Sequence, residues 1–241
     1  MMLLRELDIR RAPPVGGGTS LRRAWKAMQA ENVTTLCVAD AAGKLEGVIT
    51  LKDISTANLD GLDNYVLKKA GTSFRNVVDT LDGTVLAGDP AEKTVEGRIV
   101  VGAGSAGQME HAIHKGDIVI VSNRSEGQLT AIEAEAGCLV VCTGVEVSRI
   151  ILRVADERGC LIVSTPHNVY ATAQIIAQAA PVRHCMLTDN LLTFRLDTPV
   201  EDAAKAMGAA RYRYFPVLDG EGRYYGMVSH RNLLSRQGNR G

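Results

Sequence analysis

A repeat within the chain restricts its fold more than any other feature of the sequence. At an offset of 179 residues, segment 19–54 aligns without a gap with segment 198–233, and ten of the 36 aligned pairs are identical. Two unrelated segments of ordinary composition would share about two. The identical pairs are Thr19/Thr198, Ala24/Ala203, Lys26/Lys205, Ala27/Ala206, Met28/Met207, Ala30/Ala209, Val38/Val217, Asp40/Asp219, Gly43/Gly222 and Gly47/Gly226. The chain therefore contains two copies of one supersecondary unit.

Both copies predict the same order of elements. Thr19 or Thr198 is expected to cap an amphipathic helix, with Pro199 at the first helical position of the second copy. Two strands follow, each pair joined by a Gly-containing turn: "TLCVAD" and "LEGVIT" in the first copy, "YFPVLD" and "YYGMVS" in the second. A further helix is expected to begin near Asp53 or Asn232, which are good capping residues.

The second strand of each copy ends in the same short motif. The first copy reads "GVITLKD" (Gly47 to Asp53) and the second reads "GMVSHRN" (Gly226 to Asn232). The shared pattern is Gly, two apolar residues, Thr or Ser, two variable residues, and Asp or Asn. A helix, two hairpin-linked strands and a second helix carrying this motif resemble the CBS domain, the half-module of the nucleotide-sensing Bateman pair.

The motif places hydroxyl and carboxyl or amide groups where a nucleotide can be bound. Thr50 and Ser229 can donate to a phosphate or ribose oxygen beside the free N–H groups of a helix N-terminus. Asp53 and Asn232 can accept from ribose hydroxyls, as the acidic residue does in dinucleotide-binding folds. Helix capping alone would also explain these four residues, but their occurrence in both copies favours nucleotide binding.

The two copies differ beside the motif. The stretch "ARYRYFPV" contributes Tyr212, Arg213 and Tyr214, and here an Arg could meet phosphate and a Tyr could stack on adenine. Packing of a Tyr at a domain interface explains it equally well. Thr193 matches the polar position that the CBS resemblance implies ahead of the first helix, whereas its partner at the same offset is Pro14. We therefore expect the second half to hold the better site.

Two cations lie nearest to the two motifs, Lys52 and Arg231. Phosphate would attract both, although a solvated helix end would also explain them. The predicted nucleotide-binding residues are Thr50, Lys52, Asp53, Thr193, Tyr212, Arg213, Tyr214, Ser229, Arg231 and Asn232.

The segment between the copies has a different pattern. Four short apolar strands, "GRIVVGAG", "GDIVIVSN", "GCLVVCTG" and "GCLIVSTP", alternate with helical stretches, which predicts a mostly parallel sheet covered on both faces. Gly102, Gly104 and Gly107 fit the G-x-G-x-x-G pattern of a nicotinamide-dinucleotide site. The next strand ends in Ser122 and Asn123, however, where that fingerprint wants an acidic residue. A Gly-rich turn is the simpler interpretation, and dinucleotide binding through Gly102–Gly107 is the alternative.

The stretch "GDIVIVSNRSEGQLTAIEAEAGCLVVCTG" resembles the DRTGG domain, with Asn123 in place of the Asp of the name-giving motif. The order CBS half, DRTGG, CBS half resembles the regulatory insert of CBS-containing family II inorganic pyrophosphatases. The resemblance implies an α/β fold, with an α+β CBS pair forming a Bateman module and an inserted α/β DRTGG-like domain of mostly parallel sheet. The expected domains are residues 1–70, 71–182 and 183–241.

The same resemblance implies a function. In that family the insert controls a manganese- or cobalt-dependent phosphoesterase domain that hydrolyses diphosphate; AMP and ADP inhibit it, whereas ATP and diadenosine polyphosphates activate it. The insert pairs with its twin, which implies a homodimer through the CBS halves. The family's D-H-H motif is absent from this sequence, and the five histidines are scattered without clustered carboxylates. We therefore expect an excised or truncated regulatory region with no metal and no catalysis of its own; a dimerisation scaffold with decayed nucleotide sites is an alternative.

Composition restricts the partners and the location. Lys and Arg number 27, as do Asp and Glu, so no overall field favours nucleic acid or an anionic membrane. No apolar stretch is long enough for a transmembrane helix, and Glu6 and Asp8 occur too early for a secretory signal. The five cysteines lie mostly in apolar runs, which is typical of reduced thiols in a cytoplasmic protein.

Overall fold

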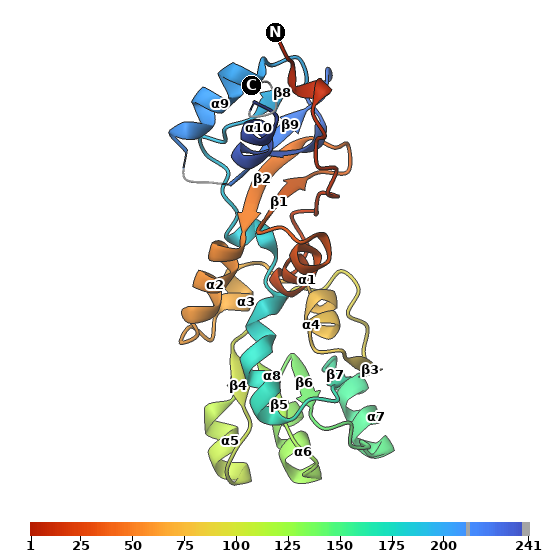
Figure 1. Cartoon of the computed structure of the whole chain (residues 1–241). Coiled ribbons are helices and arrows are strands. Elements are labelled where there is room, and N and C mark those ends of the chain that lie inside the picture. Colours follow the sequence, from red (N-terminus) through yellow and green to blue (C-terminus); the bar gives the residue numbers. More distant parts are fainter. Residues whose placement is uncertain (211–212, 238–241) are drawn as a thin grey trace. The chain divides into compact units, whose positions relative to one another are not determined.

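The computed structural model describes residues 1–210 and 213–237. The chain divides into two compact units (Figure 1). One contains Met1–Thr19, Ala24–Ser55 and the chain from Cys185 onward, and the other contains Ser20–Arg23 and Thr56–His184. Within the described ranges, no helix has the length and apolar content needed to cross a bilayer.

Each repeat folds as predicted into a helix, an antiparallel pair of strands and a second helix. In the first copy these are α1 (Leu21–Glu31), β1 (Thr35–Ala39), β2 (Leu45–Thr50) and α2 (Leu51–Leu59). In the second copy they are α9 (Val200–Gly208), β9 (Tyr214–Leu218), β10 (Tyr224–Ser229) and α10 (His230–Gln237). A short strand, β8 (Phe194–Arg195), pairs in parallel with β9.

The turns between the paired strands explain the identical Asp and Gly residues of the repeat. Asp40 Oδ1 accepts hydrogen bonds from the backbone N–H groups two and four residues later, both at 2.9 Å. Asp219 Oδ1 accepts the same two bonds at 2.9 and 3.0 Å. Gly43 and Gly222 follow with φ of +84° and +77°, a region in which glycine has no steric cost. The two turns are therefore one structure encoded twice.

The first helix of each copy starts one residue later than predicted. Ser20, not Thr19, caps α1, because its Oγ accepts a hydrogen bond from the Arg23 N–H at 3.0 Å. In the second copy Pro199 occupies the N-cap of α9 and makes no side-chain capping bond, so Thr198 is not the cap. In both copies the N-cap is therefore the residue after the threonine for which the sequence predicted that position.

The two copies exchange the segments that lead into them. Arg10, ahead of the first copy, forms an antiparallel bridge with Met227 of β10, with N–O distances of 3.0 and 2.7 Å. Leu187, ahead of the second copy, pairs in the same way with Val48 of β2, at 2.9 and 2.8 Å. The 3₁₀ helix η1 (Leu4–Glu6) also belongs to the packing of the second copy. Each strand pair is thus extended by the lead-in of the other copy.

The second unit contains a five-stranded sheet in the order β3-β7-β6-β5-β4. Its strands are β3 (Thr84–Ala87), β4 (Ile99–Val101), β5 (Ile118–Val121), β6 (Cys138–Val141) and β7 (Leu161–Ser164). The four predicted strands are β4 to β7 and run parallel, which confirms the mostly parallel sheet. The edge strand β3, antiparallel to β7, was not predicted.

Helices cover both faces of this sheet. Alternate strand residues such as Val119, Leu139 and Ile162 are buried in one core with the helices α5, α6 and α7. On the opposite face, the Cys142 thiol lies 3.5 Å from Thr172 Oγ1 of α8. The helices of this unit are α3 (Val66–Lys69), α4 (Phe74–Thr80), α5 (Ala106–Ala112), α6 (Ser125–Glu133), α7 (Arg149–Arg158) and α8 (Val169–Ile175), with 3₁₀ turns η2 (Ile176–Ala179) and η3 (Val182–His184).

The glycine-rich stretch after β4 is a turn. Gly104 has φ of +92°, and Ser105 and Gln108 form a reciprocal capping box at the start of α5. In the dinucleotide fingerprint the third glycine permits close helix–strand packing. Here a Cβ at Gly107 would have no described atom within 4 Å. The geometry therefore favours the Gly-rich turn over a dinucleotide site.

All five cysteines are free thiols, and Cys37, Cys138, Cys142 and Cys160 are buried. Burial raises the pKa of the Cys37 and Cys160 thiols to about 12. These thiols are therefore protonated at neutral pH and pack as small apolar side chains.

A buried ion pair ties β4 to the turn before β5. Arg98 Nη2 donates to Asp117 Oδ2 at 2.6 Å, and the Asp117 side chain is 2% exposed. The backbone N–H groups of Arg98 and His114 also donate to this carboxylate, at 2.9 and 2.8 Å. Burial alone would raise the pKa of Asp117, but the bonds from Arg98 and His114 together outweigh it and the pKa is lowered.

The close approach of the exchanged segments predicts the effect of a glycine substitution. In Gly226→Ala the new Cβ would lie 2.6 Å from both Arg10 O and Ile9 Cγ2, so we expect a loss of about 1–3 kcal/mol in the free energy of unfolding. Gly220→Ala is the matched control because a Cβ there meets nothing described within 4 Å. Urea denaturation measures both variants, and equal midpoints would contradict the close packing.

The ion pair predicts a pH-dependent stability. Because the pKa of Asp117 is lowered on folding, its contribution is complete above the unfolded value of about 3.9 and is lost as the pH falls through the folded value. We expect Asp117→Asn to cost about 3 kcal/mol at pH 7, and the difference from wild type to shrink below pH 4. Denaturation at several pH values tests this, with Asp63→Asn, at an exposed ion pair, as the control. A difference that is constant with pH would contradict it.

Candidate functional site: a pocket lined by both repeats

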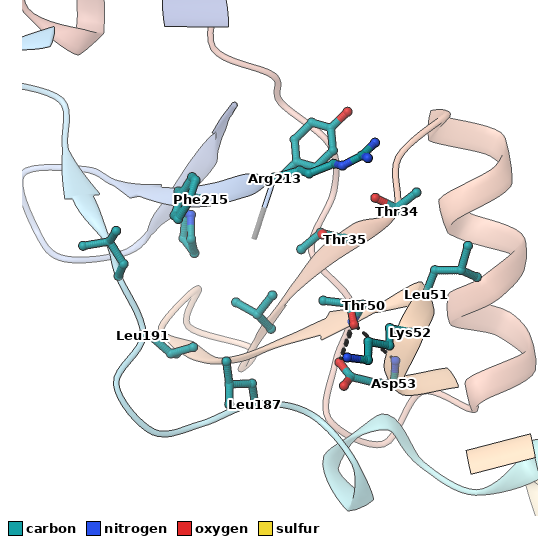
Figure 2. Close-up of a pocket in the computed structure, with 14 residues that line it drawn as sticks. Thr34, Thr35, Thr50, Leu51, Lys52, Asp53, Leu187, Leu191, Arg213 and Phe215 are labelled. Atoms are coloured by element: carbon teal, nitrogen blue, oxygen red, sulfur yellow. Dashed lines mark hydrogen bonds between the residues drawn. The ribbon is translucent and has the colours of Figure 1, made fainter. Parts of the chain in front are cut away.

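A pocket of about 460 Å³ lies within the unit that the two repeats form. Figure 2 shows the residues that line it. The first copy contributes Thr34, Thr35, Val48, Thr50, Leu51, Lys52 and Asp53; the second contributes Arg213, Tyr214, Phe215 and Pro216; the lead-in of the second copy contributes Leu187, Leu191 and Leu192. Neither copy alone could form this pocket.

The ladder between β1 and β2 brings two of the polar residues together. Thr35 is paired directly with Thr50, and directly paired residues project from the same face of a sheet. Strand β2 ends at Thr50 and α2 begins at Leu51. The N-terminus of α2 therefore forms part of the pocket wall.

The motif of each copy forms a reciprocal cap. Thr50 Oγ1 donates to Asp53 Oδ2 at 2.8 Å and accepts from the Asp53 backbone N–H at 3.2 Å. The Thr50 backbone N–H also donates to Asp53 Oδ2, at 2.9 Å. Ser229 Oγ donates to Asn232 Oδ1 at 2.9 Å and lies 3.2 Å from the Asn232 N–H. The hydroxyl residue is thus the N-cap, and α2 and α10 begin directly after it. The helices begin two residues ahead of Asp53 and Asn232, near the predicted positions, so Asp53 and Asn232 occupy the third helical position.

Some charged groups of this pocket have no partner within the described protein and can bind a ligand. Both hydrogen bonds to the Asp53 carboxylate go to Oδ2, and the structure describes none to Oδ1. Lys52 and Arg213 are exposed and form no ion pair in the part of the chain that the structure describes. A carboxylate oxygen can accept from hydroxyl groups, and unpaired cations attract phosphate. The pocket therefore carries groups for both.

The remainder of the wall is apolar. Val48, Leu187 and Phe215 are among its lining residues, and Phe215 is buried and packs edge to face against Phe194 with ring centroids 5.9 Å apart. An apolar cavity with a few placed polar groups is the usual form of a small-molecule site. The arrangement suits a ligand with an apolar part and an anionic part.

The pocket gathers half of the predicted site residues. Those that line it are Thr50, Lys52, Asp53, Arg213 and Tyr214. Thr193 is not a lining residue, and Ser229, Arg231 and Asn232 lie at the N-terminus of α10, outside this pocket. Tyr212 lies outside the described residues. Sequence reasoning expected one cleft lined by both motifs, whereas this pocket contains the motif of the first copy only.

Sequence reasoning missed Thr34 and Thr35, and the apolar wall. At the offset of 179 these threonines are the partners of Arg213 and Tyr214, so the repeat itself held a signal for them. Leu191 and Leu192 had none, because in this lead-in only the neighbouring Thr193 matched a position that the CBS resemblance implies.

The lead-ins differ in length, which makes the two halves unequal. In the first, five steps separate the bridge at Arg10 from Val15, which pairs with β1. In the second, seven steps separate the bridge at Leu187 from Phe194, which pairs with β9. The second lead-in is therefore longer by two residues, and Leu191 and Leu192 lie in this longer segment.

Comparison with known proteins agrees with this architecture. The CBS domain family matches residues 4–60 and 182–239, and the DRTGG domain family matches residues 76–179. The fold and the pocket thus define a protein with paired CBS domains and a DRTGG domain between them.

Individual relatives narrow the assignment. The "Cobalt-dependent inorganic pyrophosphatase" of Clostridium perfringens (strain 13 / Type A) is 30% identical over 232 residues, which are 96% of this chain and 42% of that protein. "Uncharacterized protein YtoI" of Bacillus subtilis (strain 168) is 25% identical over 238 residues, 94% of this chain and 53% of that protein. The chain spans about half the length of these curated relatives.

A solved structure covers the whole arrangement. The CBS and DRTGG domains of the regulatory region of Clostridium perfringens pyrophosphatase, complexed with the activator diadenosine tetraphosphate, match with a TM-score of 0.88 at 30% identity over 95% of this chain and 100% of that one. This chain belongs to the family of such CBS–DRTGG regulatory regions, and the resemblance inferred from its sequence is confirmed.

The reciprocal cap predicts the effect of removing its hydroxyl. We expect Thr50→Ala and Ser229→Ala each to lower the free energy of unfolding by about 1 kcal/mol, because the first N–H groups of α2 and α10 lose their acceptor. Thr50→Ser keeps the oxygen and should remain close to wild type. Thermal and urea denaturation provide the measurement. Equal losses in the Ala and Ser variants would show that the methyl group, not the cap, is responsible.

Proposed function

We propose that the pocket binds an adenine nucleotide and that the chain acts as the regulatory region of a pyrophosphatase. One observation carries the proposal. The Thr50–Asp53 cap orients a carboxylate with one unused oxygen at a helix N-terminus, and this group faces an apolar cavity edged by the cations Lys52 and Arg213.

The lining residues offer a different kind of contact to each of the three parts of a nucleotide. Asp53 Oδ1 accepts hydrogen bonds from the ribose hydroxyls. The phosphate lies toward Lys52, Arg213 and the first N–H groups of α2. The base occupies the apolar part of the cavity, where Phe215 and the leucines exclude water. A cavity of about 460 Å³ falls within the range of about 300–1,000 Å³ that is usual for small-molecule sites.

The regulatory role is inferred from the relatives of this chain. The regulatory region of the Clostridium perfringens pyrophosphatase is activated by diadenosine tetraphosphate. For this chain we infer that AMP and ADP inhibit, and that ATP or diadenosine polyphosphates activate, a manganese- or cobalt-dependent catalytic domain that hydrolyses diphosphate. The chain itself performs no catalysis. A ligand shifts activity only through different affinities for two conformations.

The remaining expectations complete this proposal. The chain forms a homodimer through its CBS halves and works in the cytoplasm, with domains at 1–70, 71–182 and 183–241. Thr193, Tyr212, Ser229, Arg231 and Asn232 are proposed for a second nucleotide position at the other motif. The two positions are unequal, since the described pocket contains Asp53 and not Asn232.

Isothermal titration with AMP, ADP and ATP tests the proposal. We expect sub-millimolar binding, and roughly a tenfold to hundredfold loss of affinity in Asp53→Ala, because hydrogen bonds to a charged group are removed. Asn232→Ala is the matched control, since it disturbs the equivalent cap, and its loss should be smaller. This order is the reverse of the one that the sequence alone predicts.

Two outcomes would contradict the proposal. A larger loss in Asn232→Ala would place the principal site at the second motif, and equal losses would contradict the inequality of the two positions. No heat with any of the three nucleotides, together with full dimerisation, would identify the chain as a scaffold whose nucleotide sites have decayed.

A further inference from the structure

Thr35 is a buried hydroxyl residue without a partner. The residue is 3% exposed, yet its Oγ1 takes part in no hydrogen bond in the described structure. Among the described residues that line the pocket, Thr35 is the one buried residue with a polar side chain. A buried hydroxyl usually has a partner, so its absence calls for an explanation.

The hydroxyl of Thr35 is open to the cavity. Two other threonine hydroxyls, those of Thr72 and Thr80, are unpaired and fully enclosed by protein. Thr35 Oγ1 is not enclosed in this way, and the residue forms part of the pocket wall. Figure 2 shows Thr35 on β1, beside the strand that carries Thr50.

The neighbouring hydroxyls are occupied or differently placed. Thr50 Oγ1 is engaged with Asp53 at 2.8 Å, and Thr34 is exposed at the rim. Tyr214 also carries a hydroxyl and lines the pocket, but this residue is only half-buried. Thr35 is therefore the buried hydroxyl residue that remains available inside the pocket. Since it is paired directly with Thr50 across the β1–β2 ladder, a ribose bound at Asp53 brings its attached base over this strand.

We propose that Thr35 Oγ1 hydrogen-bonds the exocyclic group on carbon 6 of the purine base. This inference rests on the proposed nucleotide function. A base in the apolar part of the cavity loses water from its polar edge, and an unpaired polar edge there weakens binding. Thr35 replaces that water with a hydrogen bond.

The chemistry of a hydroxyl defines what the site distinguishes. A hydroxyl both donates and accepts, so it accepts from the amino group of adenine and can turn to donate to the keto oxygen of hypoxanthine. It has no partner on a purine with hydrogen at carbon 6. The discriminating probe is therefore purine riboside 5′-monophosphate, compared with AMP, and inosine monophosphate is a second positive ligand.

The experiment compares these nucleotides by isothermal titration on wild type and Thr35→Val, which keeps the shape and removes the hydroxyl. We expect wild type to bind AMP about tenfold more tightly than purine riboside 5′-monophosphate, the value of one buried hydrogen bond. In Thr35→Val the AMP affinity should fall about tenfold while that of the purine ribotide stays unchanged. Thr35→Ser should retain the preference.

The outcomes separate this inference from the proposed function. If wild type binds none of the nucleotides, the proposed function itself fails. If wild type binds AMP but Thr35→Val leaves its affinity unchanged, the Thr35 hydroxyl is satisfied by water and the inference is wrong. Equal losses for AMP and the purine ribotide would also overturn it, because the residue would then act through packing.

Discussion

The reciprocal exchange of the lead-in segments is the constraint on which the rest of this unit depends. A two-stranded sheet is marginal in water by itself, and each copy supplies only two long strands. Arg10 pairs with Met227 and Leu187 pairs with Val48, so each strand pair is extended by chain from the other copy. The glycines that precede these partners in the motif, Gly47 and Gly226, admit the crossing backbone, which a Cβ would obstruct. The glycine of the motif is thus a packing requirement, separate from any contact with a ligand.

The same exchange explains why a duplicated sequence produces unequal halves. The ladder positions and the turns follow the repeat, as the paired Asp40 and Asp219 turns show. The lead-ins do not, because the second is two residues longer between its anchoring bridges. Leu191 and Leu192 extend the apolar wall from this longer segment. The pocket therefore combines the motif of the first copy with the cation and aromatic residues of the second.

The features that could be predicted from the sequence are those that depend on residues close together in the chain. The helix–strand–strand–helix order, the Asp/Gly turns and the strands β4 to β7 follow from periodicity and turn chemistry within a few residues. Strand β3 was missed because it is a four-residue, half-exposed edge strand with no alternating pattern. The lead-in exchange and the place of Leu191 were missed because they join residues more than a hundred positions apart. Thr35 was missed for another reason, since in the sequence it is one more strand-forming residue, and only burial without a partner distinguishes it.

The two motifs form the same cap but differ in the side-chain group that lies beside it. In the first copy the cap uses Asp53 Oδ2, so the other side-chain atom is an acceptor that is already oriented. In the second copy Ser229 Oγ donates to Asn232 Oδ1, so the other side-chain atom is an amide nitrogen, which is a donor. One motif, folded twice into the same cap, therefore carries different chemical groups beside the cap: a second carboxylate oxygen in the first copy and an amide nitrogen in the second.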